Sequence, residues 1–309
     1  MALSWWRLEL AVLPELEESL LWKLQELGIG RVAIQHRPER PEQRQLLAWL
    51  PASEWPEGER QTLEAALARL ADPFGLTLPP LHWQQQDEED WSLSWKQHWQ
   101  PDPVGQRLLI LPAWLDLPPE HGHRLVIRMD PGSAFGTGSH PTTRLCLEAI
   151  EALAAGPDAG PASWRGLEGC TVADLGCGSG ILGIAALLQG AGRVVAADTD
   201  ALAVRATREN AAVGGCQDRL QVVQGSVEAL AELLDGRPAD LLLCNILAPV
   251  IEALCPAFSA VLAPGGVGLL SGLLVDQVPR LEAVLAAEGW RSELASRQSA
   301  WGLLRIWKA

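Results

Sequence analysis

The sequence lacks the cysteine and histidine patterns that mark metal sites and disulfide frameworks. None of its six cysteines forms a C-x-x-C pair, and there is no H-E-x-x-H motif or cluster of His and Cys. Most of the cysteines lie in apolar runs typical of buried strands and helices, so we expect reduced thiols in the core. These absences predict a chemistry that uses no bound metal.

The sequence also lacks a long hydrophobic run. No apolar stretch approaches the roughly 18 residues that a membrane helix needs, and residues 1–7 lack the charged start and apolar middle of a signal peptide. We therefore expect a protein that stays in the cytoplasm and has no membrane partner. At 309 residues and 48% hydrophobic content, the chain is long enough for two domains, each with its own core.

Positive charge is scarce as well. The chain has 24 Lys and Arg against 38 Asp and Glu, a net charge of −14. Because phosphate contacts need a basic surface, this balance argues against direct binding to nucleic acid. The first 90 residues hold 16 acidic and 8 basic side chains, more than half of the excess. Such acidity suits a basic partner or simply aids solubility. We expect the chain to act as a monomer.

The first 90 residues have the pattern of a small α+β domain. Alternating apolar residues predict strands, and apolar stripes spaced by three or four residues predict amphipathic helices. The order is strand, helix, strand, strand, helix, strand, which is typical of a ferredoxin-like domain. The expected elements are 6–13, 14–27, 31–35, 46–50, 57–70 and 76–83. No catalytic cluster is found here, so we interpret residues 1–90 as a substrate-recognition domain.

A tryptophan-containing linker, 91–106, leads into a predicted catalytic domain, 107–309. From residue 170 onward, strands and helices alternate, which predicts a doubly wound α/β parallel sheet of the Rossmann-like kind. The last two strands, 291–296 and 301–307, are joined by a short turn and predict an antiparallel terminal hairpin. A terminal antiparallel strand is typical of methyltransferase sheets rather than of dinucleotide dehydrogenases.

The glycine-rich stretch 174–180, Asp-Leu-Gly-Cys-Gly-Ser-Gly, lies where a strand turns into a helix. Its glycines allow a sharp bend and a close approach to a ligand, and the helix start offers free N–H groups. A second strand ends in Asp198, whose carboxylate suits the two hydroxyls of a ribose. The stretch therefore predicts a nucleotide-like cofactor.

Spacing alone leaves two cofactors open. Residues 178–183 satisfy G-x-G-x-x-G, with Asp198 twenty residues after the first glycine, so a nicotinamide dinucleotide is one alternative. Asp174, two residues before Gly176, gives the D-x-G-x-G-x-G form instead. This form is the one found in methyltransferases that use S-adenosylmethionine.

A second loop, 130–143, has four small residues in a row before a helix start and offers the hydroxyls of Thr137, Thr142 and Thr143. We expect it to contact the cofactor. His140 has no partners for a metal site. We interpret it as a hydrogen-bonding residue at the helix start rather than as a general base.

The stretch 245–248, Asn-Ile-Leu-Ala, follows the fourth strand of the predicted sheet. The carbonyl oxygen of Asn245 and the neighbouring backbone carbonyls could orient an amine through its N–H groups. Methyltransferases that act on flat bases carry Asn-Pro-Pro-aromatic at this place, and the aromatic residue is missing here. We infer a non-planar acceptor such as an alkyl amine.

Together these stretches resemble the ribosomal protein L11 methyltransferase family (PrmA). The motifs are the loop 130–143, the glycine loop 174–180 with its apolar helix, the Asn245 turn, and spaced Trp, Pro and Gly residues between Trp91 and Trp114. The resemblance extends from about residue 90 to the end of the chain. Over the first 90 residues it is one of size and element order.

The resemblance implies methyl transfer from S-adenosylmethionine, leaving S-adenosylhomocysteine, to lysine side chains and the N-terminal amine of that basic ribosomal protein. It also implies that the N-terminal domain grips the substrate. The implied cofactor contacts are Thr143, Gly176, Asp198 and Asn245. With the loop residues added, the predicted cofactor site is Thr143, Gly176, Gly178, Asp198, Asn245, Phe135 and Thr137, and the predicted catalytic residues are Asn245 and Leu247.

Three positions depart from the family pattern: Ser133 stands where Leu is usual, Ser139 where Thr is usual, and Ala197 where Gly or Ile is usual. None of these changes removes a contact group. The remaining alternatives are a methyltransferase acting on another protein, RNA or a small amine, a nicotinamide-dependent oxidoreductase, and a cofactor-binding module without catalysis.

Overall fold

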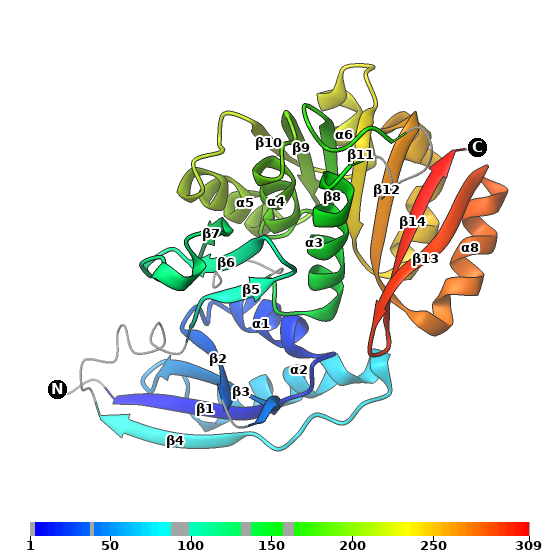
Figure 1. Ribbon diagram of the computed structural model, residues 1–309. Coiled ribbons are helices and arrows are strands. Elements are labelled where there is room, and N and C mark those ends of the chain that lie inside the picture. Colours follow the sequence, from blue (N-terminus) through cyan, green and yellow to red (C-terminus); the bar gives the residue numbers. More distant parts are fainter. Residues whose placement is uncertain (1–3, 38–39, 88–98, 131–136, 157–163, 309) are drawn as a thin grey trace. The chain divides into compact units, whose positions relative to one another are not determined.

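The computed structural model describes residues 4–37, 40–87, 99–130, 137–156 and 164–308 (Figure 1). It consists of two compact units, Met1–Gln100 and Pro101–Ala309. Among the described residues, no helix is both long and apolar enough to cross a membrane.

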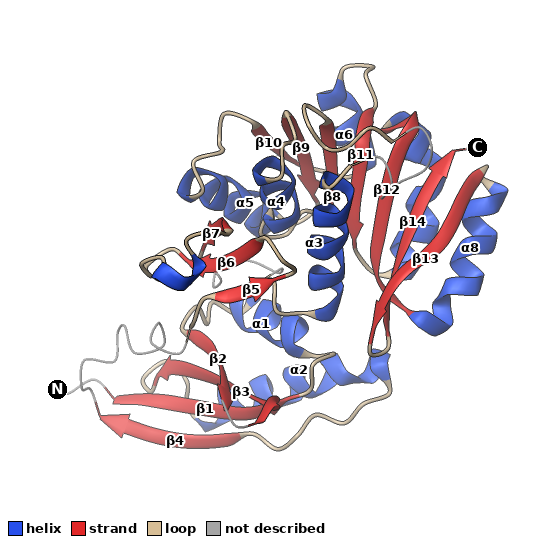
Figure 2. Cartoon of the chain, viewed as in Figure 1, coloured by secondary structure: helices blue, strands red, loops and turns tan. Residues whose placement is uncertain are grey.

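The N-terminal unit is a four-stranded antiparallel sheet with the strand order β2-β3-β1-β4. Figure 2 shows both of its helices on one face of the sheet, where Leu8, Leu10 and Leu46 meet Leu24 and Leu63 in a buried core. Its elements are β1 (Ser4–Val12), α1 (Glu17–Glu26), β2 (Val32–Arg37), β3 (Arg40–Pro51), α2 (Glu57–Ala68) and β4 (His82–Asp87). The predicted ferredoxin-like order is confirmed.

The fourth strand lies further along the chain than the sequence predicts. It was expected at 76–83 but spans His82–Asp87, because a 3₁₀ turn, Arg69–Phe74, and a chain without regular structure follow α2. Pro79 and Pro80 lack an N–H for a strand ladder, which delays its start.

The second unit is built on a seven-stranded sheet with the order β10-β9-β8-β11-β12-β14-β13. All neighbouring pairs are parallel except those made by β14, which is antiparallel to both β12 and β13. The strands are β8 (Thr171–Leu175), β9 (Arg193–Asp198), β10 (Leu220–Gln224), β11 (Ala239–Asn245), β12 (Leu262–Leu274), β13 (Trp290–Gln298) and β14 (Trp301–Lys308). The predicted doubly wound sheet and terminal hairpin are confirmed.

Helices cover both faces of this sheet (Figure 2). One face carries α3 (Pro141–Ala154), α4 (Ile181–Leu188) and α5 (Ala201–Val213). The other face carries α6 (Val227–Leu234), α7 (Ala248–Leu254) and α8 (Val278–Ala287), whose apolar residues pack on β8, β11 and β12. Burial of these two apolar layers holds the strand ends in register.

Two predicted elements near the site have different bounds. The helix expected at 249–262 is α7, which ends at Leu254, followed by a 3₁₀ turn, Cys255–Ala260. Pro256 cannot donate a hydrogen bond, which ends the regular helix. The strand expected at 266–270 is the longer β12, which has an irregularity between Leu270 and Leu273.

A small sheet of three strands precedes α3. The strands β6 and β7 were expected, but β5 and the pairing of all three were not. Their bounds are β5 (Asp102–Val104), β6 (Leu108–Pro112) and β7 (Leu125–Met129). The strand β7 packs on α4 and α5 and leads directly to the loop before α3. This sheet therefore fixes the start of the second predicted loop.

Candidate functional site

The carboxyl ends of three neighbouring strands meet at the point where the strand order reverses. Leu175 of β8 pairs with Ala197 of β9 on one side and with Cys244 of β11 on the other. Each of these residues is followed by a predicted site residue: Gly176, Asp198 or Asn245. The register thus brings the three together at one edge of the sheet, where open α/β sheets bind their ligands.

The glycine loop has the left-handed backbone that its sequence predicts. Gly176, Gly178 and Gly180 have φ values of 74°, 55° and 80°. A Cβ on Gly176 would lie 2.3 Å from Cγ2 of Ile246, so this glycine also lets the β11 turn approach the loop.

Asp198 holds the glycine loop and the chain after β9 together. Its Oδ2 accepts a hydrogen bond from the Gly178 N–H at 2.9 Å, and its Oδ1 accepts one from the Asp200 N–H at 3.0 Å. Burial raises the pKa of this carboxyl, while the two N–H groups oppose that rise. A carboxylate has about four acceptor positions, so both oxygens can still accept from ribose hydroxyls.

Asp174 lies inside β8 and is buried rather than open to a ligand. Its side chain is 1% exposed, and Oδ2 accepts a hydrogen bond from the Gly183 N–H at 3.0 Å. Burial raises its pKa to about 7, opposed by the Gly183 N–H, and the negative charge of Asp198 adds to the rise. The first acid of the sequence motif thus ties β8 to the first turn of α4.

Asn245 is tied to the second predicted loop. Its Nδ2 donates to the Thr143 Oγ1 at 3.3 Å, across 102 residues of sequence. This bond uses one N–H of the amide nitrogen. The carbonyl oxygen Oδ1 is then the end of the side chain that can accept from another donor.

Leu247, the other predicted catalytic residue, opens α7. Its side chain is 59% exposed. Its carbonyl accepts from the Val250 N–H at 2.9 Å and the Ile251 N–H at 3.1 Å, which uses both lone pairs of the oxygen. The predicted orientation of an amine by backbone carbonyls therefore does not extend to Leu247, whose remaining contribution is an exposed apolar side chain beside Asn245.

Residues 131–136 of the second loop, which include Ser133 and Phe135, lie outside the described residues. Thr137 is 4% exposed, and its hydroxyl lies 2.9 Å from that of Ser139. His140 caps α3: its Nδ1 accepts from the Thr142 N–H at 3.3 Å. This contact agrees with the interpretation of His140 as a hydrogen-bonding residue at the helix start.

Sequence reasoning missed Asn210, a fully buried residue of α5 that joins the two loops. Its Oδ1 accepts from the Asp130 N–H at 2.9 Å, and its Nδ2 donates to the Ser179 carbonyl at 2.9 Å. The available signal is an amide side chain on the apolar face of a predicted helix, because such a group needs buried partners.

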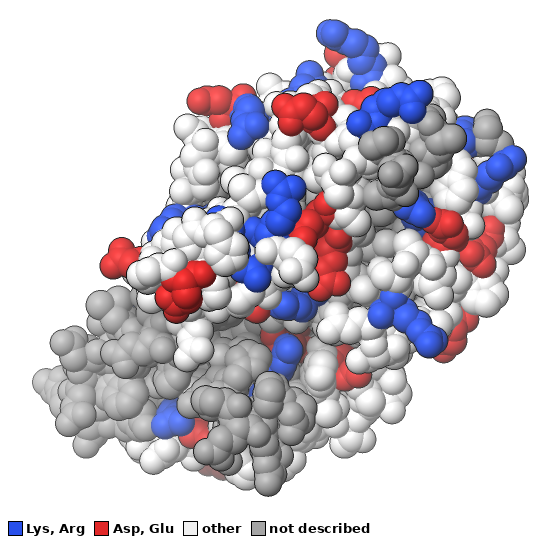
Figure 3. Space-filling view, viewed as in Figure 1, with Lys and Arg blue, Asp and Glu red and all other residues white. Residues whose placement is uncertain are grey.

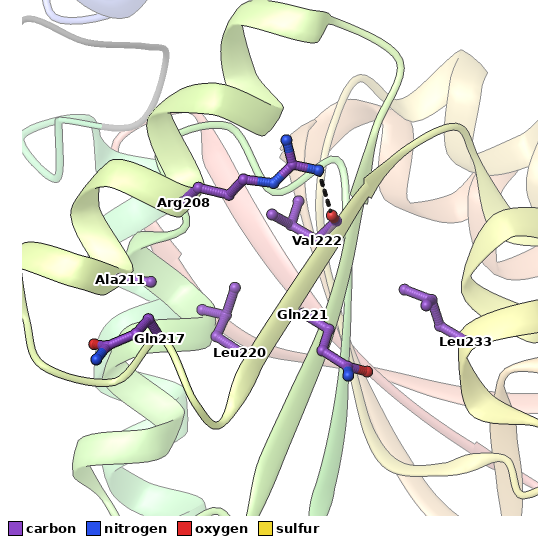
Figure 4. A pocket seen from close by; sticks show the side chains of 7 residues that line it. All are labelled: Arg208, Ala211, Gln217, Leu220, Gln221, Val222 and Leu233. Atoms are coloured by element: carbon purple, nitrogen blue, oxygen red, sulfur yellow. Dashed lines mark hydrogen bonds between the residues drawn. The ribbon is translucent and has the colours of Figure 1, made fainter.

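The pocket in Figure 4 lies elsewhere. It is at the edge strand β10, where Arg208 of α5 donates to the Val222 carbonyl at 3.0 Å. None of the predicted site residues lines it. In the part of the chain that the structure describes, no group of three or more His, Cys, Asp or Glu side chains is placed to hold a metal ion.

Comparison with known proteins decides between the alternatives. The family model described as "Ribosomal protein L11 methyltransferase (PrmA)" matches residues 4–308. Two curated relatives, both named ribosomal protein L11 methyltransferase, come from Synechococcus sp. and Parasynechococcus marenigrum. The first is 62% identical over 99% of this chain and 98% of its own length, and the second 66% identical over 95% and 98%.

The chain belongs to the ribosomal protein L11 methyltransferase family. A solved structure, of the ribosomal protein L11 methylase from Lactobacillus delbrueckii subsp. bulgaricus, is similar with a TM-score of 0.58 and 33% identity. It covers 68% of this chain and 99% of that one. The nicotinamide-dependent alternative is overturned by the family match.

As a member of this methyltransferase family, the chain uses S-adenosylmethionine. The geometry fits that cofactor: left-handed glycines allow close approach of the backbone, and Asp198 keeps acceptor positions at the end of β9. The positive-φ glycines and the carboxylate are the groups that a ribose-bearing cofactor needs at a topological switch point.

Replacement of Asp198 by alanine is expected to weaken binding of S-adenosylmethionine to this methyltransferase. Loss of a charged hydrogen-bond acceptor costs roughly 1.5–3 kcal/mol, so the Kd should rise about 10- to 150-fold. Isothermal titration calorimetry measures this change. Asp200→Ala is the matched control, because Asp200 caps α5 through the Leu202 N–H. An unchanged Kd in Asp198→Ala would reject the ribose role.

Proposed function

We propose that this protein methylates amines of ribosomal protein L11, namely lysine ε-amines and the N-terminal α-amine, with S-adenosylmethionine as the donor. The names of its relatives support this substrate. The observation that carries the proposal is the state of Asn245, whose amide nitrogen is engaged by Thr143 and whose carbonyl oxygen can accept from an amine.

In this proposal the cofactor site consists of Thr143, Gly176, Gly178, Asp198, Asn245, Phe135 and Thr137. When bound, S-adenosylmethionine supplies the methyl group on its sulfonium. Asp198 would hold the ribose, and the glycine loop would lie against the methionine part. Oδ1 of Asn245 accepts a hydrogen bond from an N–H of the incoming amine, so that the lone pair of the amine nitrogen points along the line of attack. Leu247 borders the path of the substrate.

Orientation is the main catalytic contribution of these residues. Methyl transfer to an amine is an in-line displacement, and holding the two reactants in line can be worth about 7–11 kcal/mol of the barrier. The ammonium form has no lone pair, so it must lose a proton before attack.

We further propose that residues 1–90 recognise the substrate, that 91–106 connect them to the catalytic domain 107–309, and that the enzyme works as a cytoplasmic monomer. A ribosomal protein is basic, and the N-terminal unit is acidic. On the face seen in Figure 3, acidic and basic side chains are interspersed rather than gathered into one basic surface, which supports a protein substrate over RNA.

Incubation with ribosomes and a methyl-labelled cofactor, followed by separation of protein from RNA, tests the proposal. Label in the protein fraction at the position of L11 is the expected result. Label in RNA would favour the alternative of an RNA methyltransferase, and label in neither fraction would leave a small amine or a module without catalysis.

Three exposed acids at the start of α2 provide a test of substrate recognition. Glu54, just before α2, and Glu57 and Glu59, in its first turn, fall within a six-residue stretch of the N-terminal unit. Changing all three to Gln should raise the KM for L11 roughly 5- to 10-fold at low salt, because long-range attraction of a basic partner is lost, with kcat unchanged. Steady-state kinetics at two salt concentrations measures the effect, which should shrink as salt rises.

The matched control neutralises three acids of the other unit, Glu228, Glu232 and Asp235 on and after α6, which are also exposed. An equal rise in KM in both triple variants would show that net charge alone matters and would reject recognition by the N-terminal unit.

A further inference from the structure

The terminal hairpin, β13 and β14, contacts the start of α3 through one buried tryptophan, Trp301. The start of α3 in turn holds Asn245, the residue that faces the methyl-accepting amine. We propose that Trp301 is a positioning residue for methyl transfer, which holds the Asn245 amide in place through His140 and Thr143. The inference rests on the proposed function, in which Asn245 orients the amine.

The first contact joins β14 to the residue that opens α3. The rings of Trp301 and His140 lie edge to face, with centroids 4.8 Å apart and planes at 70°. Both side chains are buried, at 4% and 5% exposure. Aromatic pairs in this geometry are stabilised beyond their buried area, so the ring of Trp301 restricts the imidazole.

The second contact passes from His140 to the first turn of α3. Its Nδ1 lies 2.8 Å from the Thr142 Oγ1 and accepts from the Thr142 N–H at 3.3 Å. A side chain that caps a helix sets where the helix begins. The position of the imidazole therefore sets the position of Thr142 and of the next residue, Thr143.

The third contact is the hydrogen bond from Asn245 Nδ2 to Thr143 Oγ1, at 3.3 Å. Thr143 is 1% exposed, so its hydroxyl moves only if the helix start moves. A carboxamide turned by half a rotation presents N–H₂ in place of its oxygen. Fixing Thr143 keeps in place the hydroxyl oxygen that accepts from Nδ2, and in this arrangement Oδ1 is the end of the amide that faces the incoming amine.

The sheet connects the same residues a second time. Asn245 lies beside Ser271 in the register of β11 and β12. The Ser271 hydroxyl, fully buried, donates to the carbonyl of Gly302 at 2.9 Å, next to Trp301. The contacts thus form a closed ring, Asn245 to Thr143 to His140 to Trp301 and back through Gly302 and Ser271. The strand β14 is thus linked to Asn245 by two routes, one through His140 and Thr143 and the other through Ser271 of β12.

Comparison of two buried tryptophans of the hairpin tests the proposal. Trp301→Ala should lower kcat for L11 methylation at least 10-fold with a smaller change in the KM for L11. Trp290, 3% exposed at the other end of the hairpin, pairs with Lys308 and serves as the matched control. Trp290→Ala should lower Tm but leave kcat per folded enzyme unchanged. Equal kcat values in the two variants would overturn the proposal.

Conservative variants keep the test sharp if Trp301→Ala folds poorly. Trp301→Phe retains a ring against His140, so it should keep most of the wild-type kcat. His140→Asn retains a cap acceptor but removes the ring that Trp301 contacts, so it should lower kcat as Trp301→Ala does. A loss of kcat in Trp301→Phe as large as that in Trp301→Ala would contradict a role through ring contact.

A double-mutant cycle separates positioning from general stability. If Trp301 acts through Asn245, then Trp301→Ala should cause little further loss of kcat in an Asn245→Ala background. Additive losses would overturn the inference. If the wild-type enzyme does not methylate L11, the proposed function fails. The same four variants are then compared by their Kd for S-adenosylmethionine, because Asn245 is also placed in the cofactor site. Non-additive Kd changes would then support positioning, and additive ones would reject it.

Discussion

Replacement of Asn245 by alanine is expected to lower kcat for amine methylation by about 10²- to 10³-fold, the range seen when one pre-organised polar contact at a reacting centre is removed. Asn245 stands at the carboxyl end of β11, level with the glycine loop and Asp198. Its Nδ2 is held by Thr143, so the side chain is oriented before the substrate arrives. Loss of this oxygen leaves the amine without an acceptor that aligns its lone pair.

Gln224 offers a matched control for this variant. It also carries an amide at the carboxyl end of a strand, β10, and donates to the Thr199 carbonyl at 3.0 Å, but it is exposed and lies at the edge of the sheet. Gln224→Ala is expected to keep the wild-type kcat. Single-turnover kinetics with saturating cofactor distinguishes a slower methyl transfer from weaker cofactor binding. A single-turnover rate within threefold of wild type in Asn245→Ala would contradict the orienting role.

The second large effect concerns stability rather than rate. The carboxyl of Asp174 has a pKa of about 7 in the folded protein, against an ordinary value of 3.8, because it is buried. The folded state therefore binds its proton more tightly than the unfolded state does. Between about pH 4 and pH 7 the free energy of unfolding should fall as pH rises, by roughly 4 kcal/mol at about 1.4 kcal/mol for each pKa unit.

Asp174→Asn isolates this contribution. The amide oxygen can still accept from the Gly183 N–H, but the side chain no longer titrates. The variant should match the wild type in free energy of unfolding near pH 4 and exceed it near pH 8. Urea denaturation at several pH values gives the difference curve. A difference that stays constant from pH 4 to pH 8 would show that the buried carboxyl does not titrate in this range.

Much of the site was predictable because the carboxyl ends of parallel strands share one edge. The glycine loop, Asp198 and Asn245 each follow an apolar run of strand type, so their meeting follows from the α/β alternation alone. The left-handed glycines likewise follow from local sequence. These features depend on neighbouring residues and on one topological rule, both of which are present in the sequence.

The parts that were not predicted depend on pairs far apart in the chain. Asp174 was identified only as the first residue of the D-x-G-x-G-x-G form, and its burial depends on the helix that covers β8. Asn210 bonds the backbone of Asp130, 80 positions away, and of Ser179, 31 positions away. Trp301 contacts His140 across 161 positions. Nothing in a single sequence says which buried amide or ring faces which loop, because that choice is made by packing of the helices on the sheet.

Whole-protein and peptide mass spectrometry of purified ribosomal protein L11, after incubation with the enzyme and S-adenosylmethionine, tests the central claim most directly. The account predicts mass increases in whole methyl units, located on lysine side chains and on the N-terminal amine, and their loss in Asn245→Ala. An unmodified L11 in the presence of wild-type enzyme that binds the cofactor would contradict it, as would methyl groups on side chains other than amines.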